Sequence, residues 1–272
     1  MSAQRWSTHA IEMTRDRVVK RFPKNDEGRA EREWRALTLL AAHAPGLAPE
    51  PWEADLAADE PVVVMSRIAG DPLRAGLLGN EQVKALAEAV TLLHSAVPAD
   101  VLDGVLPRPG RQVRLIEHLD VWGETVRPTW DGLVRQAMDA GMGWLGRSGL
   151  AAGGTGEGRA VFGPGDGNLA NYLWDGSRVR IVDFEDSGRS DRPFELAEIT
   201  EHVASWVEQP LDVAAFLGHF DLCAAETARL RECRRLLALV WLFLLAGDDP
   251  QCPRNPPGTV ERQAERLLEL LA

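Results

Sequence analysis

The sequence has few of the features that mark membrane or secreted proteins. Its most apolar run, residues 236–246, is shorter than the roughly 20 residues that a membrane-spanning helix needs. Residues 1–10 contain no apolar stretch of the kind found in a signal peptide. The cysteines Cys223, Cys233 and Cys252 have neither the spacing of metal ligands nor an even number, as in proteins from reducing compartments. We therefore expect a cytoplasmic protein with no membrane partner.

An excess of basic residues is also missing. The chain carries 41 Asp and Glu residues against 30 Lys and Arg residues, a net charge of −11. Because nucleic-acid-binding proteins present a basic face to the phosphate backbone, this composition predicts no nucleic-acid partner. The acidic charge is compatible with a cationic ligand, although many proteins are acidic for solubility alone. With 272 residues, 45% of them hydrophobic, the chain is long enough for one large domain or two lobes.

Residues with the potential for chemistry concentrate in the segment 161–199. Asp166 is followed by Asn171, and two β-like runs then flank an Asp-Gly pair, which is typical of a hairpin turn. The second run ends in Asp183. Each motif alone is common, because short motifs match by chance and Asp often occupies turns. Together they predict a hairpin that joins two Asp carboxylates and an Asn amide, the set with which kinases orient a hydroxyl and bind Mg²⁺.

These residues resemble the aminoglycoside phosphotransferase-like kinases, a family that includes kinases for choline, homoserine, macrolides and related alcohols. The usual pattern is His-Gly-Asp, four residues, Asn, a hydrophobic strand ending in Asp, and then Asp-Pro-x-x-Asp-Leu-Ala. Asp166, Asn171 and Asp183 match the catalytic and metal-binding positions. The tail pattern is matched by Asp191, Pro193, Glu195 (where Asp is usual), Leu196 and Ala197. The histidine is absent, since Gly163-Pro164-Gly165 precedes Asp166.

The resemblance implies an α+β, bilobal protein kinase-like fold. A small, truncated β-rich N-lobe would span residues 1–66, and a mainly helical C-lobe would span 67–272. The implied enzyme moves the γ-phosphate of ATP or GTP, with Mg²⁺, to a hydroxyl of a small molecule. In it, Asp166 orients the hydroxyl and accepts its proton, while Asn171 and Asp183 hold the metal. The resemblance leaves open whether the protein is a monomer or a homodimer.

Lys20 and Glu33 match two further positions of such kinases. Lys20 ends a Val-Val pair and resembles the strand lysine that contacts the nucleotide phosphates, although a strand lysine facing water has the same pattern. Glu33 follows in an expected helix, where the family has an Arg-Glu pair. The resemblance implies an ion pair between them that holds the lysine toward the phosphates. Alternatively, Glu33 favours only the N-terminal end of its helix.

The glycine-rich loop that covers the phosphates in kinases is missing, because no glycine precedes Gly28. Residues 5–8 could replace it, with Ser7 or Thr8 supplying a hydroxyl or N–H group. The later glycine-rich segment, 149–158, lacks the Lys-Ser/Thr of a P-loop. Without the loop and the histidine, the alternative is a catalytically degenerate kinase-like binding protein, or pseudokinase.

Binding residues for the base and for the acceptor are less clearly marked. A strand over 61–68 followed by Gly-Asp-Pro-Leu resembles the family hinge, where backbone groups of Ser66, Arg67 and Ile68 would bind the base; a plain strand and turn has the same pattern. Glu185, Asp186 and Asp191 follow the metal strand and are candidates for a cationic acceptor such as an aminoglycoside or amino alcohol. Two of the three could instead only stabilise the loop.

The remaining elements are predicted from hydrophobic periodicity and turn residues. Residues 5–22 are expected as a hairpin and residues 46–60 as a connecting loop. His94 is expected to be a packed structural histidine. Helices are expected over 28–42, 80–94, 112–146 (two helices), 194–207, 210–218, 222–246 and 258–271.

Overall fold

The structure, a computed structural model, describes residues 10–75, 78–152, 158–249 and 251–272. The strands are β1 (Ala10–Met13), β2 (Arg17–Arg21), β3 (Pro51–Asp55), β4 (Val62–Ser66), β5 (Asp71–Pro72), β6 (Ala160–Gly163), β7 (Tyr172–Trp174), β8 (Val179–Ile181) and β9 (Gly188–Asp191). The α-helices are α1 (Arg29–His43), α2 (Asn80–Ala96), α3 (Ala99–Leu102), α4 (Gln112–Thr125), α5 (Gly132–Ser148), α6 (Arg192–Glu201), α7 (Val213–Leu217), α8 (Ala224–Ala246) and α9 (Thr259–Leu271). Short 3₁₀ helices are η1 (Leu73–Ala75), η2 (Arg127–Thr129), η3 (Leu150–Ala152), η4 (Leu169–Asn171) and η5 (Val203–Ser205).

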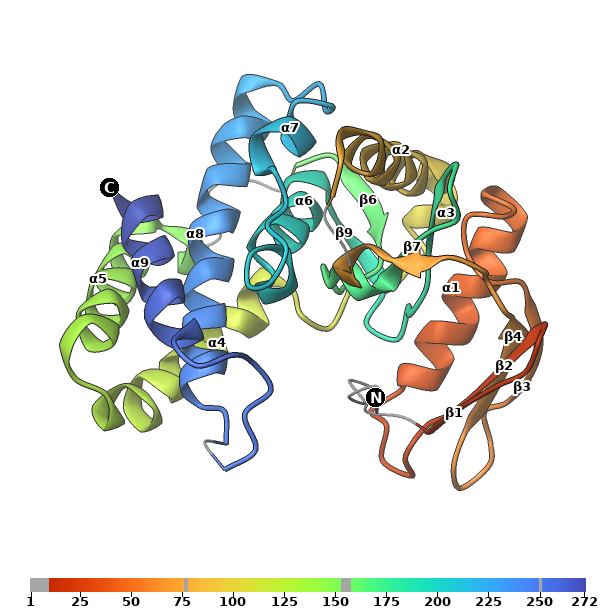
Figure 1. Ribbon diagram of the computed structural model, residues 1–272, viewed down its shortest axis with the longest axis horizontal. Coiled ribbons are helices and arrows are strands. Elements are labelled where there is room, and N and C mark those ends of the chain that lie inside the picture. The colour runs from red at the N-terminus through yellow and green to blue at the C-terminus, as the bar shows by residue number, and fades with distance from the viewer. Residues whose placement is uncertain (1–9, 76–77, 153–157, 250) are drawn as a thin grey trace.

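The small lobe consists of one sheet and one helix, at the right of Figure 1. The sheet has the order β1-β2-β4-β3 with antiparallel neighbours. Side chains alternate along β2, so that Lys20 is buried while Arg21 is exposed. On α1, Leu37 and Leu40 are fully buried where the helix packs on β3 and β4. Glu33, on the same helix, is buried and accepts a hydrogen bond from the Lys20 ammonium group, so the lysine side chain points toward the interior.

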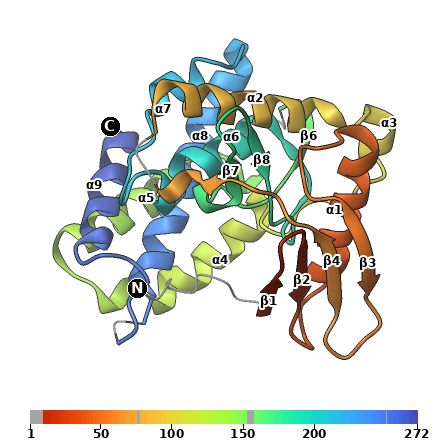
Figure 2. The same cartoon turned by 45° about the vertical axis from the view of Figure 1, so that its right-hand side comes forward.

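The helical lobe surrounds two small sheets, β5-β7-β8 and β6-β9. Helix α2 contacts β6 and β8, and α6 packs along α8. Figure 2 shows α5 and α9 at the end of this lobe that is farthest from the small lobe. The apolar run 236–246 lies in α8, and its leucines at 236, 239 and 242 are fully buried in the core. In the described part of the chain, no helix has the length and apolar character needed to cross a membrane.

Most expected elements are confirmed, but two assignments were wrong. Residues 46–60, expected as a loop, contain β3, an edge strand of the sheet. It begins at Pro51, a position where strands tolerate a missing N–H group. The helix expected over 194–207 ends at Glu201. His202 leaves the helical conformation, and its side chain caps η5 by accepting the backbone N–H of Ala204.

Candidate active site

Lys20 is the centre of an ionic cluster at the junction of the lobes. Its Nζ lies 2.6 Å from Oδ1 of Asp183, 2.7 Å from Oε2 of Glu185 and 3.3 Å from Oε2 of Glu33. The same Glu33 oxygen accepts the backbone N–H of Phe184 at 2.7 Å. The expected pair of Lys20 and Glu33 therefore forms, and the lysine also reaches the expected metal ligand. We call Lys20, Glu33, Asp183 and Glu185 the Lys20 cluster.

Burial and charge act against each other in the Lys20 cluster. Burial lowers the pKa of Lys20, but the attraction of Glu33, Asp183 and Glu185 outweighs it and raises the pKa above its ordinary value. Burial raises the pKa of Glu33 to about 7, against the attraction of Lys20. The cluster has three carboxyl groups for one ammonium group, and Asp183 is the most exposed of them at 39%. Arg29 adds a guanidinium group 3.8 Å from Glu185, so two cationic groups face three carboxyl groups, and the partly exposed Asp183 can accept a further cation.

Asn171 and Asp183 carry the oxygen donors that Mg²⁺ prefers. The C=O of Asn171 accepts the N–H of Val182 at 2.9 Å, which sets Asn171 beside the residue that precedes Asp183. Its side-chain Nδ2 donates to Oδ2 of Asp166 at 2.9 Å, which leaves the amide oxygen for a cation. Asp183 has a φ of 70°, a conformation that non-glycine residues keep at functional sites under constraint. With two oxygen donors, the pair fits a Mg²⁺ whose remaining ligands are nucleotide phosphates and water.

Asp166 is held by neutral donors in the turn before η4. Its Oδ1 accepts the backbone N–H of Asn168 at 2.9 Å, and its Oδ2 accepts the Asn171 amide. His202 Nε2 lies 3.4 Å from Oδ1. Burial raises the pKa of Asp166 to about 6; the N–H of Asn168 opposes this shift and the carboxylate of Asp183 adds to it. The side chain is still 36% exposed, so a ligand can reach a carboxylate whose basicity is raised.

Some backbone groups of the residues expected to bind the base already form hydrogen bonds within the protein. The backbone N–H of Ser66 donates to the C=O of Glu50 at 2.9 Å, and that of Arg67 donates to the C=O of Asp16 at 2.8 Å. Strand pairing and the neighbouring turn therefore already use these two N–H groups. Ile68 is the one of the three whose backbone takes part in no hydrogen bond within the described ranges. Residues 5–8, the expected substitute for the glycine-rich loop, lie outside the described residues.

The three acidic acceptor candidates have different surroundings. Glu185 belongs to the Lys20 cluster and is 12% exposed. Asp186 is 37% exposed and lies 4.0 Å from a guanidinium nitrogen of Arg32. Asp191 is buried, contacts Arg229 at 2.9 Å and caps α6. Asp191 therefore stabilises the start of α6, and Asp186 is the most accessible of the three candidates.

Comparison with known proteins identifies the family to which the chain belongs. The sequence model of the "Phosphotransferase enzyme family" matches residues 4–237. The chain belongs to this phosphotransferase family. The resemblance seen in residues 161–199 is confirmed, and with it the bilobal kinase-like fold and the assignment as a phosphotransferase enzyme.

Solved kinase structures share the fold of this phosphotransferase at low sequence identity. The choline kinase LicA from Streptococcus pneumoniae is 17% identical, with a TM-score of 0.62 over 99% of this chain and 91% of its own. A choline/ethanolamine kinase family protein from Mesorhizobium loti is 20% identical, with a TM-score of 0.56 over 97% and 85%. Spectinomycin phosphotransferase APH(9)-Ia, in complex with ADP and spectinomycin, is 11% identical, with a TM-score of 0.65 over 100% and 91%. No curated protein matches the sequence.

Sequence reasoning missed a second ionic cluster in this phosphotransferase, beneath the catalytic turn. Arg108 is 3% exposed and lies 2.8 Å from Glu195 and 2.7 Å from Glu198. It also donates to the C=O of Gly165 at 2.7 Å, directly before Asp166. We call Arg108, Glu195 and Glu198 the Arg108 cluster. The three acidic residues of α6, Glu195, Glu198 and Glu201, lie among apolar ones and were the one signal that buried cations are needed, because unpaired buried carboxylates are costly.

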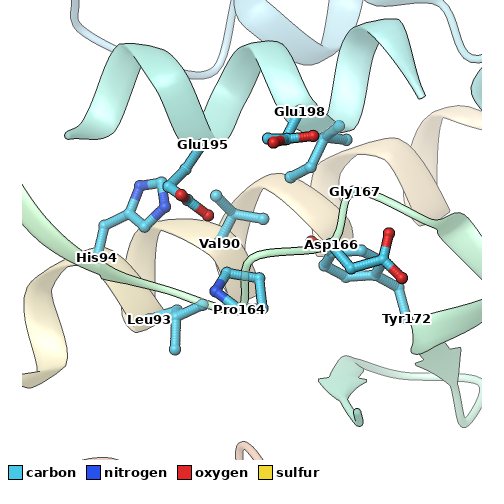
Figure 3. A pocket seen from close by; sticks show the side chains of 10 residues that line it. Val90, Leu93, His94, Pro164, Asp166, Gly167, Tyr172, Glu195 and Glu198 are labelled. Carbon is cyan, nitrogen blue, oxygen red and sulfur yellow. The ribbon is translucent and has the colours of Figure 1, made fainter. Parts of the chain in front are cut away.

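Close packing also restricts the catalytic turn. Gly165 has a φ of 82°, and a Cβ there would overlap the C=O of Asp186, so glycine is required. Figure 3 shows Asp166 with the His94, Tyr172 and Glu195 side chains, whose surroundings leave no room for a water molecule. Burial lowers the pKa of His94 to about 3, which agrees with a neutral, structural histidine. A ligand can therefore approach Asp166 from its exposed side, not from behind.

Proposed function

We propose that this phosphotransferase moves the γ-phosphate of ATP or GTP to a hydroxyl group of a small molecule. One observation carries the proposal: Asn171 is hydrogen-bonded both to Asp166 and to the backbone of Val182, the residue directly before Asp183, and Lys20 contacts Asp183 from the small lobe. These are the groups that phosphoryl transfer uses to orient a hydroxyl, hold a metal and contact phosphates. ADP in a solved structure of the same fold supports a nucleotide as the donor.

Asp166 would position the acceptor hydroxyl and accept its proton. Two neutral donors, from Asn168 and Asn171, hold its carboxylate, and its raised pKa makes it a better proton acceptor than an ordinary Asp. In a loose phosphoryl-transfer transition state the protein contributes mainly positioning and charge. Fixing the carboxylate therefore lowers the entropy lost when the hydroxyl is aligned for attack.

Lys20 would exchange partners when nucleotide binds. In the structure its ammonium group contacts Glu33, Asp183 and Glu185. Bound Mg²⁺ would supply charge neutralisation for the phosphates, held by Asn171 and Asp183. Lys20 would then contact the phosphates while Glu33, itself anchored by the N–H of Phe184, keeps the lysine in place.

A cationic alcohol, such as an amino alcohol or an aminoglycoside, is the acceptor class that we propose. The printed names of structures with this fold include a choline kinase and a spectinomycin phosphotransferase. Asp186 is an accessible carboxylate three residues after Asp183, and Glu185 lies beside it. Burial raises the pKa of Asp186, and a cation bound beside it would lower that pKa again.

Phosphate transfer to a panel of aminoglycosides, amino alcohols and nucleosides, with labelled ATP or GTP and Mg²⁺, tests the proposal. Asp166→Asn keeps the shape of the side chain but removes its charge, so kcat should fall by about 10²- to 10⁴-fold with little change in nucleotide binding. Asp59→Asn is the matched control, because Asp59 is 88% exposed and pairs with Lys24 in the small lobe. Nucleotide binding without transfer to any acceptor or to water would favour the pseudokinase instead.

A further inference from the structure

His202 lies directly beside the catalytic carboxylate. It follows α6, and its ring is 7% exposed. Its Nε2 is 3.4 Å from Oδ1 of Asp166. On the other side of the ring, Nδ1 accepts the backbone N–H of Ala204 at 3.0 Å. Because an accepting nitrogen carries no proton, the neutral ring has its proton on Nε2, toward Asp166.

The position and the charge of this ring are both fixed. The indole of Trp241 meets it edge-on at 4.5 Å between centroids, and the cap on Ala204 prevents the ring from turning over. Burial, with the positive charge of Arg74, lowers the pKa of His202 to about 3. The imidazole is therefore a neutral N–H donor at physiological pH.

A neutral donor suits the task of Asp166. A cation at this distance would form an ion pair with the carboxylate and reduce its basicity. The groups that donate hydrogen bonds to Asp166 in the structure, from Asn168 and Asn171, are neutral as well. The residue before Gly165 is Pro164, which has no side-chain donor, so the preceding part of the turn offers no equivalent group.

We propose that His202 is a positioning residue that directs the carboxylate of Asp166 toward the acceptor hydroxyl. Its Nε2 lies on the side of Oδ1 at 3.4 Å, longer than an ordinary hydrogen bond, and Asn171 holds Oδ2 with a hydrogen bond of 2.9 Å, so the two side chains flank the carboxylate. The role rests on the proposed phosphate transfer. It assigns His202, a residue outside the motif of 161–199, a share in orienting the catalytic group.

Two substitutions separate this role from the structural role of capping. In His202→Asn, the amide oxygen takes the place of Nδ1 and keeps the cap on Ala204, since Asn is a favoured cap, but no donor reaches Asp166. In His202→Gln, the longer amide puts an N–H group near the position of Nε2 and loses the cap. If His202 positions Asp166, kcat should fall about 10- to 100-fold in His202→Asn, while the nucleotide KM stays unchanged. A fall of this size is seen when groups that orient a reactive ligand are removed.

His202→Gln should regain most of kcat at a lower melting temperature. A purely structural histidine gives the opposite order, with His202→Asn close to wild type and His202→Gln impaired. In the Asp166→Asn background, His202→Asn should cause no further loss of kcat, because the histidine acts through Asp166. An independent loss there would overturn the role.

Nuclear magnetic resonance of the ring nitrogens gives a readout without turnover. We expect a protonated Nε2 and an unprotonated Nδ1 in wild type, and a shifted Nε2–H resonance in Asp166→Asn. The opposite tautomer would overturn the proposal. If wild type transfers phosphate to no acceptor and not to water, the proposed function fails and this role fails with it. Transfer by wild type with unchanged kcat in His202→Asn overturns the role of His202 alone.

Discussion

The Lys20 cluster and the Arg108 cluster contain the same chemistry in different surroundings. In each, one buried cation contacts carboxylates from a different part of the chain. The Lys20 cluster includes Asp183, which is 39% exposed, whereas the carboxylates of the Arg108 cluster, Glu195 and Glu198, are 2% and 11% exposed. A cluster with an exposed member can exchange partners for a metal and phosphates, but a closed one cannot.

This difference separates a binding role from a supporting role. The Lys20 cluster joins the small lobe to the segment after β8, so it should respond to ligands. The Arg108 cluster joins α6 to the C=O of Gly165 below the catalytic turn, so it should respond mainly to folding. Removing one partner of a fully buried ion pair leaves an uncompensated charge, which is far more destabilising than losing an exposed partner.

The largest effect is expected for Asp183→Ala, in the Lys20 cluster. Loss of this oxygen ligand should abolish Mg²⁺-dependent phosphate transfer. The melting temperature should change little, because Lys20 keeps Glu33 and Glu185 as partners and the removed side chain is partly exposed. Transfer assays and thermal melting check both parts. Normal transfer together with a large loss of stability would make Asp183 a turn residue and remove the contrast between the clusters.

A large effect on stability is expected for Arg108→Met, in the Arg108 cluster. Two buried carboxylates and the C=O of Gly165 would lose their cation, and the free energy of unfolding should fall by about 3–5 kcal/mol. Urea denaturation measures this loss. Lys20→Met is the comparison, and it should reduce stability less while weakening nucleotide binding. Equal losses of stability in the two variants would show that both clusters are structural.

The two clusters also differ in how far the sequence predicted them. Lys20, Glu33 and Asp183 belong to motifs whose order and spacing are characteristic of kinases, so their meeting was expected. Arg108 contacts Gly165 across 57 residues, from a connecting loop without periodicity, and nothing local in the sequence marks that contact. The side chain of a long loop is positioned by tertiary packing, which a single sequence does not display.

Errors in local structure also carried over to the site. Because β3 was taken as a loop, the hydrogen bond from Ser66 to Glu50 next to that strand was not foreseen, and Ser66 was expected to bind the base. His202 was placed inside a helix, where its ring would have no fixed relation to Asp166. Its actual position depends on the end of α6 at Glu201, and helix ends are the least predictable part of a helix.

A moderate, pH-dependent effect is expected for Glu198→Gln. Burial raises the pKa of Glu198 to about 7; Arg108 opposes this shift and Glu195 adds to it. The folded state thus keeps a proton that the unfolded state releases near pH 4.5, so the contribution of Glu198 to stability is present at low pH and is lost as the pH rises toward 7. The Gln variant should lose less stability between pH 5 and 7 than wild type, by about 1–3 kcal/mol.

Urea denaturation at several pH values measures this difference. Glu88→Gln is the control, because Glu88 lies exposed on α2 and should leave the pH dependence of wild type unchanged. A pH dependence as steep in Glu198→Gln as in wild type would mean that other groups carry the proton. In that case, burial of the Arg108 cluster would not change the protonation of Glu198.

The smallest effect is expected at an exposed ion pair, which sets the baseline for both clusters. Lys84 and Glu88 are one helical turn apart on α2, 3.6 Å from each other and 65% and 66% exposed. Solvent screens such a pair, and ordering two long side chains offsets most of the attraction. Lys84→Ala should change the free energy of unfolding by no more than about 0.5 kcal/mol, with kcat and nucleotide KM unchanged. If Lys84→Ala lowered the free energy of unfolding as much as Arg108→Met, an exposed ion pair would contribute as much to stability as a buried one, and burial would not distinguish the clusters.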